Sequence, residues 1–246
     1  MSAPVSVRPA PVAVALDAPS HRVAVEWARA VGPYVSVVKV GLETYLRDGA
    51  DVVAAVAEAS GCPVFLDLKL HDIPNTVAGA ARSVAPLVPR FFTVHALGGA
   101  AMVAAAVAEL PDTDVAAVTV LTSMSPGDLE TVGLVGTARD AVRRLAELAV
   151  TAGARAVVCS PQEVADVRSV VGADVTLITP GVRPAGSAAG DQARVATPEQ
   201  ALADGADLLV IGRPLTASAA PAAAAHALAS QLSGWGTGWR RDAGTR

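Results

Sequence analysis

Residues 64–69 read Val-Phe-Leu-Asp-Leu-Lys, and they are followed by an Ala-rich stretch of helical length, Thr76–Leu87. The first stretch is an almost continuous apolar run of strand length, which is typical of a parallel strand that is covered on both faces. The second has the length and composition of a helix that covers such a strand. A strand followed by a covering helix indicates an α/β fold.

The same unit recurs along the whole chain. We predict strands at Val12–Asp17, Val35–Gly41, Val64–Lys69, Phe91–His95, Val115–Thr122, Ala156–Ser160, Val175–Thr179 and Leu208–Gly212. We predict helices at His21–Val31, Asp51–Ser60, Thr76–Leu87, Ala100–Leu110, Ala138–Ala152, Pro161–Val171, Pro198–Ala203 and Pro214–Leu232. Eight alternating units, without a G-x-G-x-x-G motif after the first strand, favour a closed (β/α)₈ TIM barrel over a doubly wound sheet.

Composition and length agree with a single barrel domain. The chain has 246 residues, of which 52% are hydrophobic and only 3% aromatic, so its core must be built from Val, Leu, Ile and Ala. We predict a flexible N-terminal arm at residues 1–10, the barrel catalytic domain at 11–232 and a disordered C-terminal tail at 233–246.

The charge and the hydropathy pattern exclude several classes of protein. A net charge of −4 is unlike the basic footprint of a nucleic-acid binder. We find neither a signal peptide nor an apolar stretch of the roughly 18 residues that a membrane span needs, so we predict a cytoplasmic protein with no membrane partner. The two cysteines are too few for a disulfide framework or a thiolate metal site.

The lysines stand out because there are so few of them. Of the 19 basic residues, 17 are Arg, and only Lys39 and Lys69 are Lys. An ammonium group can donate a proton, whereas a guanidinium group effectively cannot. Both lysines fall near the C-terminal ends of predicted strands, where the active site of a (β/α)₈ barrel lies.

Charged side chains gather at the end of the third predicted strand. Asp67 and Lys69 are separated by one residue, so they face the same way on a strand, and Asp72 follows in the next loop. Together these groups predict a catalytic centre. The alternative is a salt-bridge cluster that merely closes the barrel.

A second polar constellation lies at the seventh and eighth predicted strands. Thr179-Pro-Gly-Val-Arg183 opens a long loop that includes Gln192, and Gly212-Arg213 ends the last strand. Barrels of this type often bind phosphate with the loops after these two strands and a helix N-terminus. Gly212 would let an oxyanion approach the backbone, and Arg213 offers a forked cation. The alternative is an ordinary surface loop with a glycine at a helix start.

With these residues in place, the chain resembles the orotidine 5'-monophosphate decarboxylase family from about Val12 to Leu232. The matching motifs are Val-Ala-Leu-Asp17, Val-Lys39-Val-Gly, Asp67-Leu-Lys-Leu-His-Asp-Ile-Pro-Asn-Thr76, Leu-Thr122-Ser, Thr-Pro-Gly-Val-Arg183, Gly-Asp-Gln192 and Ile-Gly-Arg213-Pro. The resemblance implies decarboxylation of orotidine 5'-monophosphate to uridine 5'-monophosphate and carbon dioxide, the final step of de novo pyrimidine synthesis. It implies neither a cofactor nor a metal.

The resemblance also implies roles for individual residues. Lys69 would protonate C6 of the pyrimidine, Asp67 would face the substrate carboxylate, and Lys39 and Asp17 would complete the charge network and hold ribose hydroxyls. Thr122 would contact the nucleotide. The phosphate would be held by Arg183, Gln192, Gly212 and Arg213. Asp72, Ile73 and Thr76 would reach into the site of a neighbouring subunit, which makes the predicted partner a second copy of the chain in a homodimer.

Two other functions compete with this prediction. One is a magnesium-dependent sugar-phosphate synthase or decarboxylase of the same barrel superfamily, such as a hexulose-phosphate synthase or a ketogulonate-phosphate decarboxylase. Those enzymes resemble the chain in an Asp-x-Lys-x-x-Asp segment but hold magnesium partly through an acidic residue on the second strand, where this chain has Lys39. The other is a non-catalytic nucleotide-binding barrel.

Overall fold

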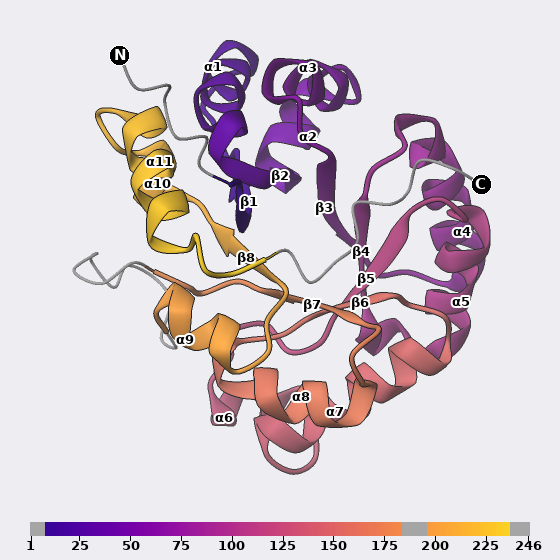
Figure 1. Ribbon diagram of the computed structural model, residues 1–246. Coiled ribbons are helices and arrows are strands. Elements are labelled where there is room, and N and C mark those ends of the chain that lie inside the picture. The colour runs from indigo at the N-terminus through magenta and orange to yellow at the C-terminus, as the bar shows by residue number, and fades with distance from the viewer. Residues whose placement is uncertain (1–7, 184–195, 237–246) are drawn as a thin grey trace, which may run out of the picture.

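A computed structural model describes residues 8–183 and 196–236, and within these residues eight parallel strands close into a barrel in the order β1 to β8 (Figure 1). Each strand pairs with the next, and β8 pairs with β1 to close the ring. The strands are β1 (Ala10–Ala15), β2 (Val35–Gly41), β3 (Val64–Leu70), β4 (Phe91–His95), β5 (Asp114–Val118), β6 (Ala156–Val158), β7 (Thr176–Thr179) and β8 (Leu208–Ile211). The prediction of a (β/α)₈ barrel is confirmed.

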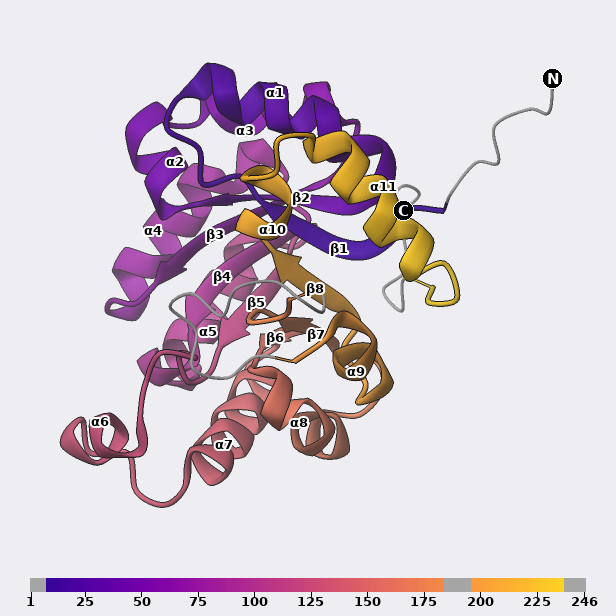
Figure 2. The same cartoon turned by 90° about the vertical axis from the view of Figure 1, so that its left-hand side faces the viewer.

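Helices surround the barrel, and along the chain they lie between consecutive strands (Figures 1 and 2). They are α1 (His21–Val31), α2 (Leu42–Asp48), α3 (Asp51–Ser60), α4 (Pro74–Val84), α5 (Ala100–Glu109), α6 (Pro126–Thr131), α7 (Ala138–Thr151), α8 (Val164–Val171), α9 (Pro198–Ala203), α10 (Arg213–Thr216) and α11 (Pro221–Gln231). Local sequence sets several of their starts. For example, Thr137 and Asp140 form a capping box at α7. No helix in the described ranges is long and apolar enough to cross a membrane.

Some predicted boundaries differ from the structure. Helix α4 begins at Pro74 rather than Thr76, because the fixed φ of proline suits the first turn of a helix. The predicted helix Pro214–Leu232 is two helices, and Pro221 starts the second one. Strand β5 ends at Val118, four residues before Thr122. The apolar run continues beyond that strand because Val120 and Leu121 line a pocket.

The described residues include residues 8–10 of the predicted arm and residues 233–236 of the predicted tail. Strand β1 begins at Ala10, one residue inside the predicted arm. Residues 1–7 and 237–246 lie outside the described residues, as does Gln192.

One layer of side chains inside the barrel has a contribution from every strand. This layer is Ala13, Val37, Phe65, Phe91, Ala116, Ala156, Ile178 and Leu208, and all of its members are buried. It is separate from the larger core that packs the outside of the barrel against the helices. Because side chains on a strand face the same way at every second residue, the next inward-facing layer begins two residues further along each strand.

Candidate active site

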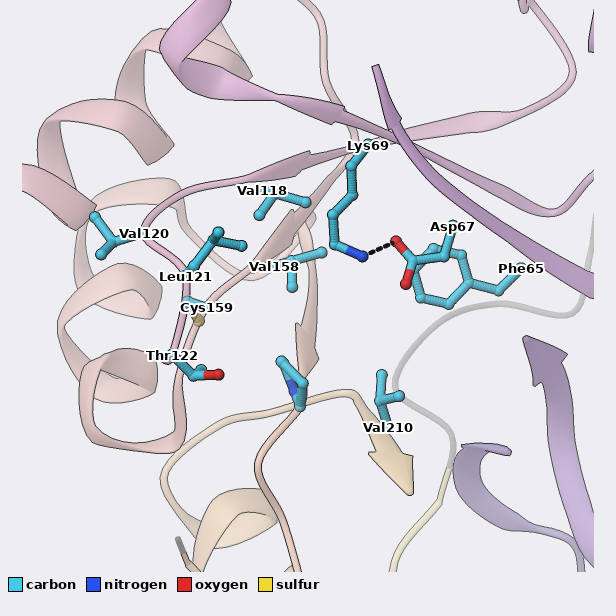
Figure 3. A pocket seen from close by; sticks show the side chains of 11 residues that line it. Phe65, Asp67, Lys69, Val118, Val120, Leu121, Thr122, Val158, Cys159 and Val210 are labelled. Atoms are coloured by element: carbon cyan, nitrogen blue, oxygen red, sulfur yellow. Dashed lines mark hydrogen bonds and ion pairs between the residues drawn. The ribbon is translucent and has the colours of Figure 1, made fainter. Parts of the chain in front are cut away.

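The next inward layer is divided between polar and apolar side chains. On β2, β3 and β4 it consists of Lys39, Asp67 and Thr93, all of which are buried. On the opposite side, Val118, Val158 and Val210 line the pocket that Asp67 and Lys69 also line. Figure 3 shows the Lys69 side chain directed towards Asp67, with the valines across the pocket. The barrel therefore presents a charged half and an apolar half to one cavity at the C-terminal ends of its strands.

The charged half is a chain of alternating charges. The Nζ atom of Lys69 lies 2.8 Å from Oδ1 of Asp67, and the Nζ atom of Lys39 lies 3.1 Å from Oδ2 of the same carboxylate. On its other side, Lys39 Nζ lies 3.8 Å from Oδ1 of Asp17, which follows β1. One carboxylate thus holds two ammonium groups, one on each oxygen.

The Asp67 carboxylate stays ionised in this environment. Burial acts to raise its pKa, because a charged group is less stable away from water. The two neighbouring ammonium groups and their hydrogen bonds act in the opposite direction and outweigh burial, so the pKa of Asp67 lies below its ordinary value. The network therefore holds two cations beside a fixed anion.

Lys69 has an unusual backbone conformation. Its φ is +52°, in the left-handed region that residues other than Gly and Asn seldom adopt. The pairing of β3 with β4 is also irregular here, because Leu66 pairs with Phe92 but Leu70 pairs with Val94. Between these two pairs, β3 therefore uses four residues where β4 uses two. The direction of Lys69 depends on this bulge as well as on strand alternation.

The predicted residues that follow β3, in the loop and in the first turn of α4, lie apart from this network. Asp72, Ile73 and Thr76 are all exposed, and Oδ1 of Asp72 accepts a hydrogen bond from Ile73 N–H at 2.6 Å. Within residues 8–183 and 196–236, no ion pair joins Asp72 to either lysine. The chain thus brings together Asp17, Lys39, Asp67 and Lys69 and leaves Asp72 at the surface.

The predicted nucleotide-binding residues surround the same mouth of the barrel. Thr122 lines the pocket in the loop after β5. Arg183 follows β7, where its N–H bonds the carbonyl of Ala196 at 3.0 Å. Gly212 directly follows β8, and Arg213 is the first residue of α10. Three of the four predicted phosphate ligands therefore come from the ends of two adjacent strands.

Two residues of the site were not predicted from the sequence as functional. Thr93 is fully buried and donates a hydrogen bond from Oγ1 to Oδ1 of Asp67 at 3.0 Å. Gly41 lies beside Asp17 and Lys39, and a Cβ atom there would be 2.8 Å from Asp17 Oδ1 and 2.9 Å from Lys39 Nζ. Gly41 was visible in the Val-Lys39-Val-Gly motif, but its contacts are not apparent from local sequence.

The carboxylates of the site pair with lysine side chains. The described part of the chain contains no group of three or more His, Cys, Asp or Glu side chains placed to hold a metal ion. The position on β2 that would need an acidic ligand holds Lys39, whose ammonium lies between two carboxylates. This arrangement does not favour the magnesium-dependent alternative.

The fold and this site define a (β/α)₈-barrel enzyme with a buried lysine–carboxylate network at the C-terminal mouth of the barrel. Residues 10–228 match the family model described as "Orotidine 5'-phosphate decarboxylase / HUMPS family". The chain belongs to this family, and its similarity to orotidine 5'-phosphate decarboxylases identifies it as a carboxy-lyase.

The individual relatives agree with this assignment. An orotidine 5'-phosphate decarboxylase of Thermobifida fusca is 69% identical over 223 residues, which cover 91% of this chain and 96% of the relative. One from Frankia casuarinae is 57% identical and covers 92% of this chain and 89% of the relative. The crystal structure of the Lactobacillus acidophilus orotidine 5'-phosphate decarboxylase matches with a TM-score of 0.77 at 35% identity, over 91% of this chain and 99% of that one.

Proposed function

We propose that this chain converts orotidine 5'-monophosphate to uridine 5'-monophosphate and carbon dioxide, and that the Lys39–Asp67–Lys69 network is the reacting centre. The reaction is the final step of de novo pyrimidine synthesis, and we place it in the cytoplasm. The observation that carries the assignment is the position of Lys69, whose ammonium group is held by Asp67 and lines the pocket at the barrel mouth.

The chemistry asks for a cation at a defined place. Loss of carbon dioxide leaves negative charge on C6 of the pyrimidine, in an orbital that the ring delocalises poorly. A preorganised ammonium group stabilises such a charge electrostatically in a site shielded from water. Lys69 supplies this cation and then donates the proton that converts the carbanion to product. Because this lysine performs both tasks, we infer that the reaction needs no organic electron sink.

Asp67 has two roles in this proposal. It holds both ammonium groups in place, since one of its oxygens contacts Lys69 and the other contacts Lys39. It also faces the substrate carboxylate, and the repulsion between the two anions disappears as carbon dioxide leaves. We give the second role less weight than the action of Lys69.

The remaining residues bind the nucleotide. We assign the ribose hydroxyls to Asp17 and Lys39 and a nucleotide contact to Thr122. We assign the phosphate to Arg183, Gln192, Gly212 and Arg213. The positions of Arg183, Gly212 and Arg213 after β7 and β8 support the phosphate assignment, because barrels often bind phosphate at these two strand ends. Binding energy from this remote group speeds the reaction if it is used to assemble the site.

We further propose that the active form is a homodimer in which Asp72, Ile73 and Thr76 complete the partner's site. Exposed apolar side chains support this proposal. They follow three neighbouring strands at the same end of the barrel and are Leu42 and Leu46 after β2, Ile73 after β3 and Leu97 after β4. Ile73 is 65% exposed beside Asp72, so one contact surface would carry the carboxylate into the neighbouring subunit.

A single assay tests the function and the role of Lys69. Adding orotidine 5'-monophosphate to protein kept in excess chelator should give the absorbance change of conversion to uridine 5'-monophosphate. Lys69→Ala should fold, as judged by circular dichroism, but should lose turnover by several orders of magnitude. Lys69→Arg keeps the charge but cannot donate a proton, so it should also be inactive.

The same assay can contradict each part of the proposal. A strict requirement for magnesium would favour a sugar-phosphate enzyme instead. Binding of the nucleotide without release of carbon dioxide would favour a non-catalytic barrel. Substantial turnover by Lys69→Ala would remove Lys69 from the chemical step.

A further inference from the structure

Thr93 connects the two central residues of the site. It lies on β4, and its side chain is in the inward layer beside Asp67. Its hydroxyl group donates a hydrogen bond to Oδ1 of Asp67 at 3.0 Å and accepts one from the backbone N–H of Lys69 at 2.9 Å. Oδ1 of Asp67 is also the atom that contacts Lys69 Nζ. One hydroxyl therefore contacts both the carboxylate of Asp67 and the backbone of Lys69.

The hydrogen bond to the backbone has a structural reason. In the bulge between β3 and β4, Lys69 adopts its positive φ and its N–H bonds the side chain of Thr93. A partly buried N–H group is stabilised by a hydrogen-bond partner, and a strained conformation persists only when its surroundings hold it. The Thr93 hydroxyl provides that partner at the residue whose side chain carries the reacting ammonium.

The hydrogen bond to Asp67 has an electrostatic consequence. A donor to a carboxylate favours the ionised form and limits the rotation of the carboxylate group. Oδ1 then faces Lys69 while Oδ2 remains directed to Lys39. The two ammonium groups are consequently held at separate, defined positions.

We propose that Thr93 is a positioning residue, whose hydroxyl sets the direction of Lys69 and of the Asp67 carboxylate towards the reacting carbon. This inference rests on the proposed roles of Lys69 and Asp67. Thr93 acts through these two residues and needs no contact with the substrate. Its loss should therefore slow the chemical step and leave binding of the nucleotide unchanged.

The test compares Thr93→Val, which has nearly the same shape but no hydroxyl, with Thr93→Ser, which keeps the hydroxyl. We expect Thr93→Val to lower kcat by about a hundredfold, because a displacement of about 1 Å can cost this much in rate. KM and the affinity for uridine 5'-monophosphate, measured by calorimetry, should remain within about twofold of the parent values. Thr93→Ser should recover most of the lost kcat.

The pH dependence of kcat provides a second measurement, which would not change if Thr93 had a purely structural role. Without the Thr93 donor, the pKa of Asp67 should rise, so the acidic limb of kcat in Thr93→Val should move to higher pH. Should Thr93→Val fail to fold by circular dichroism, Thr93→Ser and Thr93→Cys replace it as a pair that differs mainly in donor strength. The Cys variant should then be clearly slower than the Ser variant.

Lys69→Ala measured in the same assay separates the two levels of the argument. An active Lys69→Ala would overturn the proposed function of the lysine itself. An inactive Lys69→Ala together with an unchanged kcat in Thr93→Val would overturn the role of Thr93 alone. Equal losses in the Val and Ser variants, or a parallel loss of affinity for uridine 5'-monophosphate, would also overturn it.

Discussion

The individual side chains of the site stabilise one another by charge. Asp67 is the common partner of Lys39 and Lys69, and both lysines act to lower its pKa. Asp17 adds a second carboxylate on the far side of Lys39. Small changes next to this network should therefore alter activity more than stability.

Gly41 provides the sharpest test of that expectation. Its φ is −95°, which alanine tolerates, but a Cβ atom would press on Asp17 and Lys39. We expect Gly41→Ala to displace these side chains and to lower kcat/KM about tenfold or more, with little loss of melting temperature. Steady-state kinetics and thermal unfolding measure the two effects. Gly234→Ala is the control, since a Cβ atom there meets nothing within 4 Å. Unchanged kinetics in Gly41→Ala would show that the network tolerates displacement.

His95 should make the stability of the protein depend on pH. Burial lowers its pKa from 6.5, and the nearby His71 and Lys69 lower it further against the opposing effect of Asp67. In the unfolded chain the imidazole binds a proton as the pH falls below about 6.5, whereas in the folded chain it does so only at lower pH. The free energy of unfolding should therefore decrease as the pH falls below 6.5.

Replacing His95 should remove this part of the pH dependence. Urea unfolding between pH 5 and 8 should give a flatter stability curve for His95→Gln than for the parent. His21→Gln, at an exposed position on α1, should keep the slope of the parent. Parallel curves for His95→Gln and the parent would show that His95 contributes no such dependence.

At the scale of secondary-structure elements, one arginine links helix α8 to the starts of β7 and β8, at the end of the barrel opposite the site. Arg168 on α8 donates hydrogen bonds to the carbonyls of Gly172 at 2.6 Å, Val175 at 2.8 Å and Gly205 at 2.9 Å, and it pairs with Asp207. These residues precede β7 and β8, so one side chain links the starts of two strands to a helix.

Loss of this arginine should affect stability without affecting catalysis. We expect Arg168→Met to lower the free energy of unfolding by about 2 kcal/mol, because two partly buried carbonyls and Asp207 lose a charged donor. The kcat should not change, since residues at this end of a barrel serve stability. Urea unfolding and the decarboxylation assay measure both. Arg22→Met, which breaks an exposed ion pair with Glu26, should cost about 0.5 kcal/mol or less. A similar loss in both variants would contradict the special role of Arg168.

At the scale of the whole molecule, the proposed dimer places residues of two subunits in each site. Lys69→Ala and Asp72→Ala homodimers should both be nearly inactive. In a mixed dimer of the two variants, one site carries both substitutions and the other carries neither. Equal mixing after reversible dissociation should therefore restore about a quarter of the parent activity.

A substitution that prevents dimer formation supplies the control. Recovery should disappear when Ile73→Glu is added to both variants, and sedimentation should then show monomers. Absence of recovery in a mixture that sedimentation shows to contain mixed dimers would contradict a shared site. Full activity of Asp72→Ala alone would do the same.

Periodicity and composition were enough to predict the barrel and most of its elements. Strands β2 and β4 and helices α1, α3 and α9 have the predicted bounds. Helix α2 was missed because it carries no buried apolar stripe, and its Leu42 and Leu46 face outward. A pattern based on a hydrophobic face cannot identify a helix whose apolar side chains are exposed.

The sequence by itself determined the alternation of strands and helices and the presence of Lys39, Asp67 and Lys69 near strand ends. These properties depend on neighbours within a few residues, which local patterns record. Only the tertiary structure decided that Thr93 contacts Asp67 across 26 residues of chain, that Gly41 leaves space for two charged groups, and that a bulge directs Lys69. Those contacts arise from the closure of the barrel, which places side chains from different strands within hydrogen-bond distance.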